Sequence, residues 1–580
     1  MINTTKNQTM KKIRNSFILI LAAAFLASCS GLNKMKKEAG DIKYEVTPKV
    51  LEAHGGLVNV TIKGTFPEKY FNKKATLTVT PVLTYEGGET AFEKVQVLQG
   101  EKVQANNKVI TYTGGDFTYT SAIPYNAAMK KSELVLRTTA SIKEKNLEFD
   151  PLKLADGVIA TSTLVQIHAR PIIMKDNYVR ITPEVKTADV NYVINRADIR
   201  NTELKDADIT ALLDYLIAAG SDSTRVAKGV TTSSYASPDG AFDFNEKLAG
   251  KRGVAADKLI KKPFNFYEPS KAEGFFTMLT TAEDWEGFKT EVENSSIQDK
   301  DLILRVLSMY SDPVVREKEI KNMSAAYEAL KTDILPKLRR SKLQVNVDVI
   351  GRTDEQILAQ MRTDPKVLGL EEMLHAGALS KDAGEKLAFY KATAEAFPKC
   401  IRAHNNVGCV LLGQGKPDEA LASFEKAKAI ANNDVVKNNT AFVYLVKGDL
   451  AKAEELFNSM TAATTESKWG LGVIAITKGE YDKAVNYFGT EPCFNNALAQ
   501  VLKGDVNKAK ATLDGMKEPC VDGKSGYLKA VVGARLDDKN YMLAGLKEAI
   551  AAKADWKAYA KTDLEFAKYF ADSAFMALVQ

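Results

Sequence analysis

The chain has 580 residues, of which 45% are hydrophobic and 26% are charged, with a formal net charge of +6. This composition excludes a wholly disordered or fibrous protein, and at about 100–200 residues per domain the length predicts three to five domains. Four of the basic residues and no acidic residue lie in residues 1–28, so the rest is nearly neutral, which excludes nucleic acid as an expected partner.

Residues 1–28 are predicted to be a secretory signal. Lys11-Lys12-Ile13-Arg14 precedes an apolar run from Phe17 to Ala27, which is shorter than the roughly 20 residues of a membrane-spanning helix. The sequence Leu26-Ala27-Ser28-Cys29 that follows resembles the lipobox of bacterial lipoproteins. That resemblance implies cleavage before Cys29 and acylation of this residue. The alternative is an ordinary signal peptide with an incidental cysteine.

Residues 29–40 are predicted to be the lipidated cysteine and a short flexible tether. Several acyl chains make membrane anchoring stable. No acidic run follows the cysteine, which resembles lipoproteins that are sorted to the outer membrane and face the periplasm. The expected location is therefore the outer membrane, on its periplasmic side.

Residues 41–185 have a strand-like pattern. Val58, Val60 and Ile62 alternate with polar residues, and short apolar runs recur between Gly-Gly pairs. Short alternating strands with glycine-rich turns are typical of a β-sandwich. We predict a β-sandwich domain here that acts as a spacer or a protein-docking module.

Residues 186–355 mix strand and helix periodicity and predict an α/β domain. Strands are expected at 190–194, 229–236, 275–279 and 343–349, and helices at 209–217, 245–261 and 324–340. Pro336 should kink or end the last helix. Residues 263–323 are interpreted as an insertion.

The stretch from Gly240 to Arg252 resembles the OmpA C-terminal-like peptidoglycan-binding family. The resemblance covers about 165 residues and implies that an acid and an arginine grip the diaminopimelate of the stem peptide. Such a carboxylate and guanidinium suit the ammonium and carboxylate groups of that ligand. The match is partial, because serine stands where the family has its acid. The candidate peptidoglycan-binding residues are Ser237, Asp239, Asn245 and Arg252.

Residues 356–580 contain a repeat with a period near 34. Gly415, Gly448 and Gly479 are 33 and 31 residues apart, each preceded by an apolar helix pattern. A second helix follows each glycine, with alanine and phenylalanine four residues apart at Ala420/Phe424, Ala453/Phe457 and Ala484/Phe488. This skeleton resembles tetratricopeptide repeats and predicts an all-α superhelix of five or six helix pairs with a concave groove.

Asparagine pairs recur on the first helices of these repeats. An asparagine amide offers a donor and an acceptor that suit a peptide unit, and similar residues hold an extended peptide in some tetratricopeptide grooves. The alternative is that they cap or solvate helix starts. The candidate peptide-groove residues are Asn405, Asn406, Asn438, Asn439, Asn495 and Asn496.

No motif predicts catalysis, a metal site or a cofactor. Gly413-Gln414-Gly415-Lys416 is followed by Pro417, where a phosphate-binding loop needs Ser or Thr. Glu-Pro-Cys recurs at Cys493 and Cys520, which suggests a disulfide in an oxidising compartment as a hypothesis.

The combined architecture resembles outer-membrane lipoproteins of Bacteroidota that are accessory to assembly or secretion machines. The leading hypothesis is a non-enzymatic, lipid-anchored periplasmic scaffold that contacts peptidoglycan and a protein partner. One alternative is a pure protein-interaction subunit without peptidoglycan binding. Another is a cell-wall or polysaccharide-active enzyme, which would need paired carboxylates that the sequence does not locate.

Overall fold

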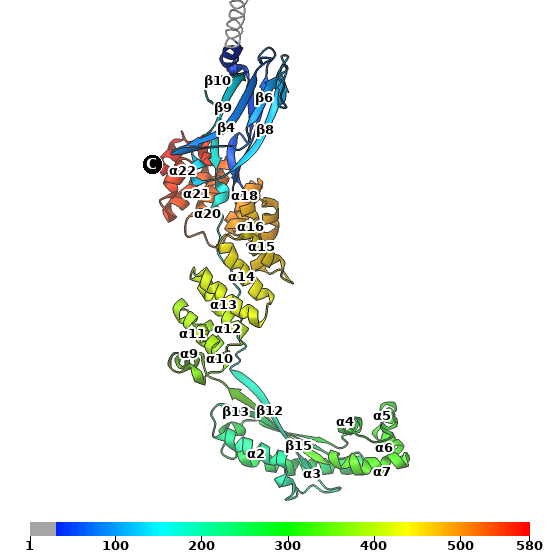
Figure 1. The fold of residues 1–580 in the computed structure, drawn as a ribbon. Coiled ribbons are helices and arrows are strands. Elements are labelled where there is room, and N and C mark those ends of the chain that lie inside the picture. Colours follow the sequence, from blue (N-terminus) through cyan, green and yellow to red (C-terminus); the bar gives the residue numbers. More distant parts are fainter. Residues whose placement is uncertain (1–30) are drawn as a thin grey trace, which may run out of the picture. The chain divides into compact units, whose positions relative to one another are not determined.

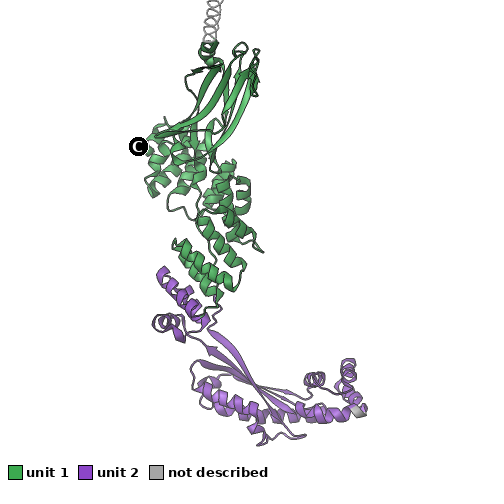
Figure 2. Ribbon diagram, viewed as in Figure 1, with its two compact units in different colours: residues 1–174, 397–580 green, residues 175–396 purple. Residues whose placement is uncertain are grey.

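The computed structural model describes residues 31–580, which form two compact units (Figure 2). Unit 1 combines the chain up to Met174 with Phe397–Gln580, and unit 2 comprises Lys175–Ala396. Unit 1 is therefore built from two stretches that are far apart in the sequence. None of the helices in residues 31–580 has the length and apolar character that crossing a bilayer requires.

The N-terminal part of unit 1 is the β module, residues 43–159. Its strands follow the order β1-β3-β2-β11-β9-β4-β6-β7, with β8 on β3, β10 on β9 and β5 on β4. The strands are β1 (Lys43–Thr47), β2 (Val50–His54), β3 (Leu57–Phe66), β4 (Thr76–Tyr85), β5 (Gly88–Ala91), β6 (Gln96–Gly100), β7 (Lys108–Ile110), β8 (Gly115–Pro124), β9 (Ser132–Ile142), β10 (Lys145–Glu148) and β11 (Leu152–Ile159). The predicted β-rich N-terminal region is thus confirmed.

The core of the β module forms because its long strands alternate apolar and polar residues. Val58, Val60 and Ile62 of β3 point inward and are buried in one cluster with Leu77 and Val79 of β4. Alternate residues of a strand lie on opposite faces of the sheet, so the polar members face outward.

The predicted tether after Cys29 is shorter than expected. Residues 31–37 are helical, and Leu32 and Met35 are buried in the core of the β module. The Tyr70 hydroxyl donates a hydrogen bond to the Met35 carbonyl oxygen at 2.8 Å. Apolar residues spaced three apart give this helix a face to bury, so the predicted tether over residues 29–40 is wrong from residue 31 onward. Cys29 and the predicted signal lie outside the described residues.

Unit 2 contains a four-stranded sheet with the order β12-β15-β13-β14 (Figure 1). The strands are β12 (Ile181–Asn191), β13 (Arg225–Tyr235), β14 (Phe276–Thr281) and β15 (Arg340–Ile350). β12 pairs with β15 along all of its eleven residues. The predicted domain boundary at residue 185 therefore falls inside a strand, and the α/β sheet begins at Ile181.

Two groups of helices accompany this sheet. α2 (Ala207–Gly220) and α3 (Phe242–Lys261) pack on it and share its apolar core. A second core lies among α4 (Trp285–Glu293), α5 (Lys300–Met309), α6 (Pro313–Asn322), α7 (Ser324–Asp333) and α8 (Leu335–Leu338). The predicted insertion, 263–323, thus contains β14 of the sheet as well as α4–α6. The helix is interrupted at Ile334, between α7 and α8, so that Pro336 lies in the first turn of α8, where proline is tolerated, and not in a helix interior.

The helical region begins at α9 (Asp354–Thr363), α10 (Leu370–Leu379) and α11 (Ala383–Ala396) in unit 2. In unit 1 it continues with α12 (Ile401–Gly413), α13 (Pro417–Ile430), α14 (Asp434–Val446), α15 (Leu450–Asn458), α16 (Thr465–Lys478), α17 (Tyr481–Phe488), α18 (Phe494–Lys503), α19 (Val506–Asp514), α20 (Lys524–Arg535), α21 (Lys539–Ala552), α22 (Trp556–Lys561) and α23 (Ser573–Val579). Successive helices pack in pairs, α12 with α13 through α20 with α21. The predicted all-helical C-terminal region is confirmed.

Small residues let the paired helices approach one another. A methyl group on Gly408 would lie 2.5 Å from the Phe424 ring, and one on Gly472 equally close to the ring of Phe488. The phenylalanine rings that recur in the sequence therefore fill the space that the glycines leave. Ala420 and Ala484 are fully buried beside them.

The β module and the last repeats pack together within unit 1. His54 of β2 lies edge-on to Tyr481 of α17, with ring centroids 4.6 Å apart. The Thr161 hydroxyl donates to Glu565 Oε1 at 2.6 Å, and Lys130 Nζ donates to the Tyr559 carbonyl oxygen at 2.8 Å. The two parts of unit 1 therefore share buried polar contacts as well as apolar ones.

Candidate functional site: an asparagine-lined groove

The groove of the helical array holds a segment of the same chain. This groove segment, residues 165–174, follows the short helix η3 (Thr161–Leu164) and has no regular secondary structure. Its residues contact α18, α16, α14 and α12 in that order, so the segment runs opposite to the repeats. The predicted peptide-groove asparagines therefore meet an extended backbone that is part of this protein.

Three asparagines each hold both backbone polar groups of one residue of the groove segment. The Met174 N–H donates to Asn406 Oδ1 and Asn406 Nδ2 donates to the Met174 carbonyl, both at 2.8 Å. The same pair of bonds joins Asn439 to Ile172 at 2.7 and 2.9 Å. It also joins Asn495 to Gln166 at 3.0 and 2.8 Å. Each amide thereby satisfies a donor and an acceptor that would otherwise lack partners.

The repeat phase explains why these three asparagines act alike. Asn406, Asn439 and Asn495 each stand nine residues before a glycine with positive φ, which ends the first helix of its repeat. They therefore occupy the same position on successive helices. On the segment, residues 166, 172 and 174 differ by even numbers, so an extended chain presents them along one edge.

In the repeat between Asn439 and Asn495, an aromatic side chain contacts the groove segment in place of an asparagine. Gly470 stands at the asparagine position of α16, and the preceding residue, Trp469, is buried. The Trp469 ring lies 4.4 Å from the His168 ring, and the Arg170 guanidinium lies 4.5 Å from its centre. Burial and the neighbouring Arg170 charge lower the pKa of His168.

The groove segment also makes charge and sulfur contacts. Arg170 Nη1 lies 3.0 Å from Glu491 Oε1, which follows α17. Cys409 Sγ lies 3.4 Å from the Ile172 carbonyl oxygen, and burial raises the pKa of this thiol. Sequence reasoning did not predict Trp469, Glu491 or Cys409 as groove residues. Only Trp469 carried a usable signal, since it shares the repeat phase of Asn405 and Asn438.

The other three predicted asparagines have different roles. Asn405 Nδ2 donates to the Ile172 carbonyl at 3.0 Å and so assists Asn439. Asn438 Nδ2 donates to Asn439 Oδ1 at 3.1 Å, and its own Oδ1 is buried without a hydrogen bond among residues 31–580. Asn496 Nδ2 donates to the carbonyls of Gly489 and Glu491 and thereby holds a turn.

In unit 2 the chain that continues from the groove segment stays close to α10. The Asn177 N–H donates to Glu371 Oε2 at 2.6 Å. The His375 ring lies between two carboxylates, with Nδ1 3.2 Å from Asp176 and Nε2 3.2 Å from Asp354. Within residues 31–580, no group of three or more His, Cys, Asp or Glu side chains is placed to hold a metal ion.

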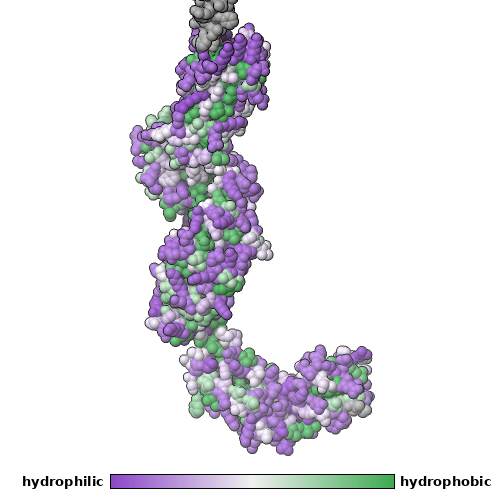
Figure 3. Space-filling model, viewed as in Figure 1, coloured by the Kyte–Doolittle hydropathy of each residue, from purple (hydrophilic) through white to green (hydrophobic). Residues whose placement is uncertain are grey.

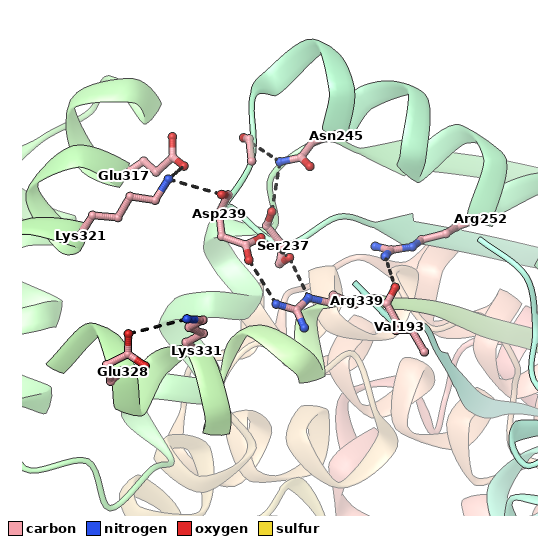
Figure 4. A network of polar contacts seen from close by, with 11 residues as sticks. Val193, Ser237, Asp239, Asn245, Arg252, Glu317, Lys321, Glu328, Lys331 and Arg339 are labelled. Carbon is pink, nitrogen blue, oxygen red and sulfur yellow. Dashed lines mark hydrogen bonds and ion pairs between the residues drawn. The ribbon is translucent and has the colours of Figure 1, made fainter. Parts of the chain in front are cut away.

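The predicted peptidoglycan-binding residues lie around the loop between β13 and α3 (Figure 4). Ser237 Oγ donates to Asp239 Oδ1 at 2.5 Å, and Asn245 Nδ2 donates to the carbonyls of Ser237 and Gly240. Arg339, next to β15, lies 3.1 Å from Asp239 Oδ2. Asp239 thus already has a cationic partner, which sequence reasoning missed.

Arg252 does not face the same space as Asp239. Arg252 is 1% exposed, and its side chain donates to the backbone carbonyls of Arg196 and Tyr235 and to that of Val193, which Figure 4 shows. Burial lowers the pKa of this guanidinium to about 10. With three carbonyl acceptors, Arg252 ties α3 to the sheet and to the chain that follows β12, and it is not placed to receive a ligand carboxylate.

The loop is also covered by the inserted helices. Lys321 of α6 donates to the Asp239 carbonyl at 3.3 Å and pairs with Glu317 (Figure 4). Pro238 lines a small cavity with residues of the helical core, among them Trp285, Phe288 and Tyr327. Side chains of this chain therefore occupy the surroundings of the predicted ligand loop.

The four cysteines in residues 31–580 are free thiols. Cys493 and Cys520 belong to neighbouring repeats, and the disulfide suggested for them is absent from this structure. Burial raises the pKa of both thiols, that of Cys493 to about 11.

Comparison with known proteins identifies the repeat. Residues 401–434, which span α12 and α13, match the tetratricopeptide repeat family. No curated protein compared with this chain matches it significantly.

Solved structures similar to the chain are repeat proteins or assemblies. A tetratricopeptide repeat protein from Parabacteroides merdae is 18% identical, with TM-score 0.29, covering 36% of this chain and 91% of its own. YrrB, described as a tetratricopeptide repeat protein with an unusual peptide-binding site, is 18% identical, with TM-score 0.25 and coverages of 30% and 97%. The Cut9–Hcn1 hetero-tetramer of the APC/C is 12% identical, with TM-score 0.32 and coverages of 59% and 77%. Residues 401–434 thus match a tetratricopeptide repeat, and the other helix pairs of the C-terminal region, through α20 and α21, are packed in the same pairwise way.

Proposed function

We propose that the protein is a non-enzymatic interaction scaffold of a bacterial cell envelope. In this proposal an acylated Cys29 anchors it to the outer membrane on the periplasmic side. Its groove receives an extended segment of a protein partner, in an assembly or secretion complex, by exchange with the groove segment. The observation that carries the proposal is the pairing of Asn406, Asn439 and Asn495 with backbone groups.

Backbone recognition makes exchange chemically possible. Asn406 and Asn439 bond to the N–H and carbonyl groups of the segment, which every residue except proline offers alike. Two side chains of the segment, His168 and Arg170, add contacts to Trp469. A partner segment with a cation at the Arg170 position, and without proline opposite an asparagine, would meet the same groups.

The groove segment competes with any partner for the groove, so a partner needs a high affinity to displace it. A covalently linked segment has an effective concentration of about millimolar or more, so a free peptide must bind more tightly or the segment must be weakened. Loss of the side chains of His168 and Arg170 should weaken the segment and leave the asparagines unchanged. Loss of the asparagines should weaken both occupants.

These opposite effects define the test. The probe is a labelled peptide that copies residues 165–175. We expect it to bind the His168→Ala/Arg170→Ala variant more tightly than wild type, by at least tenfold. Adding Asn406→Ala and Asn439→Ala to that variant should abolish binding. If the weakened variant binds no peptide, the groove serves only the protein's own segment. If it does bind, capture from crosslinked envelopes with the same variants identifies the partner, and failure to capture any protein argues against one.

The geometry favours the form of this proposal without peptidoglycan contact. Asp239 is paired with Arg339, and Arg252 is buried against backbone carbonyls, so neither of the charges expected to grip diaminopimelate is free. A sedimentation assay with purified peptidoglycan tests this point directly. The opposite result would be pelleting of the wild type that is lost in Asp239→Asn but kept in Asp243→Asn, on the neighbouring turn. That result would show that the protein contacts peptidoglycan through Asp239.

A further inference from the structure

We propose that the end of the β module next to residue 31 binds an anionic phospholipid surface through a collar of lysines. This inference rests on the proposed acylation of Cys29, which places that end at a membrane. We define the lysine collar as the exposed residues Lys34, Lys37, Lys69, Lys73, Lys74, Lys102 and Lys143.

The β module has almost no freedom to move away from its anchor. Leu32 and Met35 are 3% and 1% exposed in its core, and a side chain on Gly31 would collide with Asn72. Only Ser30 separates Cys29 from this packed helix. A chain extends at most about 3.6 Å per residue, so the Cα atoms of Cys29 and Gly31 are at most about 7 Å apart.

This distance lies within the range of electrostatic attraction. The Debye length at physiological ionic strength is about 8 Å, and the field of an anionic membrane decays over the same distance. Lysines at the end of the β module next to Gly31 therefore experience the headgroup charge. Those at the far end of the module, about ten strand residues away, do not.

Strand register shows which loops share this end (Figure 1). Thr76, the first residue of β4, pairs with Ser141 at the end of β9 and with Gln99 at the end of β6. Phe66, the last residue of β3, pairs with Gly115, the first of β8. The loops after β3, β6 and β9 therefore lie together with the helix of residues 31–37.

These segments carry a net positive charge. Residues 31–41, 67–75, 101–104 and 143–145 contain nine lysines and five acidic residues, a net charge of +4. Asp116, which pairs with Thr65, and Asp150, which is paired with Lys36, also lie at this end and lower its net charge to +2, so the rest of residues 31–580 is neutral overall. Figure 3 shows hydrophilic residues around this end of the β module.

Several collar lysines have no internal acid to neutralise them. Lys34, Lys69 and Lys73 pair with Glu38, Glu68 and Glu101. In contrast, no ion pair is formed within residues 31–580 by Lys37, Lys74 or Lys143; Lys102 forms no close ion pair, but its charge acts on the neighbouring Glu101. Ammonium groups without an internal partner are free to bind lipid phosphates.

An aromatic residue adds to this surface. Tyr112, in the loop before β8, is 39% exposed, and the Lys73 ammonium lies 4.9 Å from the centre of its ring. Tyrosine is favoured at the level of lipid headgroups, where its ring is apolar and its hydroxyl is hydrated. The lysine collar and this ring together match an anionic bilayer surface.

The test uses the mature chain, residues 29–580, with Cys29→Ser, so that lysines act without acyl chains. Binding is measured by co-sedimentation with vesicles of phosphatidylcholine, with or without 30% phosphatidylglycerol. We expect binding only to the anionic vesicles, falling at least tenfold when salt is raised from about 50 to 300 mM. The triple variant Lys74→Glu/Lys102→Glu/Lys143→Glu should reduce it to the level on neutral vesicles.

A matched variant controls for total charge. Lys426→Glu/Lys517→Glu/Lys547→Glu alters three exposed lysines of the helical array by the same amount and should leave vesicle binding unchanged. Equal binding by the collar variant and wild type, or equal binding to both vesicle types, would overturn the proposal.

Acylation is tested separately. Labelling of wild type, but not of Cys29→Ser, with a fatty-acid analogue supports the anchor. Absence of labelling would contradict the proposed acylation of Cys29. The vesicle assay would still test the lysine collar, because it uses a protein without acyl chains.

Discussion

Asn439 and Asn405, which lie on successive repeats, are hydrogen-bonded to each other, with Asn439 Nδ2 2.8 Å from Asn405 Oδ1. Both also donate to the carbonyl of Ile172. The asparagines of α12 and α14 therefore form one connected polar network, in which these two repeats orient each other's amides. Such networks are most stable when every member has a partner, and the groove segment supplies partners for Asn405 and Asn439 but not for the buried Oδ1 of Asn438.

Removal of one clamping asparagine should loosen the groove segment locally. Asn439→Ala deletes the two bonds to Ile172 and leaves buried polar groups unpaired, which costs about 1–3 kcal/mol. We expect faster hydrogen exchange at the amides of Ile172 and Met174. Asn496→Ala is the matched control, because Asn496 holds a turn and not the segment. Unchanged exchange at Ile172 in Asn439→Ala would contradict the clamp.

Trp469 and Arg170 should be energetically coupled. An arginine over a tryptophan ring contributes about 0.5–2 kcal/mol, depending on its exposure. A double-mutant cycle with Arg170→Ala and Trp469→Phe, followed by urea denaturation, should give a coupling energy in that range. A cycle of Trp469→Phe with Lys426→Ala should be additive within about 0.5 kcal/mol, since Lys426 lies on another repeat. Additivity in both cycles would mean that the observed stacking does not contribute.

Arg252 is expected to be a structural residue. Arg252→Ala leaves three backbone carbonyls without their donor, and each unsatisfied group costs about 1–3 kcal/mol. We therefore expect the variant to lose at least about 3 kcal/mol in chemical denaturation. Lys251→Ala, on the exposed side of the same helix, should change stability by less than about 0.5 kcal/mol. A stable Arg252→Ala protein would instead point to a role in binding.

The free energy of unfolding of unit 1 should increase as the pH rises from 8 to 10, because the pKa of Lys130 is lowered in the folded state. Burial beside Tyr559 lowers the pKa of Lys130 to about 8, from an ordinary value of 10.5. Between these values the unfolded chain binds a proton that the folded chain lacks, so the free energy of unfolding increases with pH. We expect a rise of about 1–3 kcal/mol. Above pH 10 the trend reverses, since burial raises the pKa of Tyr527 and unfolding then releases its proton.

Substitution isolates this effect. The rise with pH should vanish in Lys130→Met and persist in Lys131→Met, whose side chain is exposed. Urea denaturation at pH 8, 9 and 10 can be followed by tryptophan fluorescence, because Trp556 stacks on Tyr527 at 4.4 Å in the same region. An identical pH dependence in the two variants would remove Lys130 as its cause.

Local patterns in the sequence were sufficient for many elements of this fold, but not for the helix of residues 31–37 or for α4–α6. The alternation of Val58, Val60 and Ile62 identified a strand, since neighbouring side chains of a strand face opposite ways. The spacing of Gly415, Gly448 and Gly479 identified the repeats, because each helix pair needs the same turn. Pro336 marked a helix end. These features depend on residues that are close together in the chain.

The same logic located the groove asparagines but not their partner. Asn406 and Asn439 recur in phase, which placed them on one surface of the array. Their hydrogen bonds go to backbone groups of Ile172 and Met174, more than 200 residues away. A backbone N–H or carbonyl is chemically the same in almost any residue, so nothing in the segment's sequence reveals that the groove selects it.

The sequence by itself determined many of the secondary-structure elements, the repeat period and the face on which the asparagines lie. Only the tertiary structure decided that the groove holds its own chain, that Arg339 pairs with Asp239, that Arg252 is buried and that Met35 packs into the β module where a tether was predicted. Whether a charged side chain is free or paired depends on residues brought close by folding of the whole unit, and the free energy of that pairing is set by burial, which neighbouring sequence does not encode.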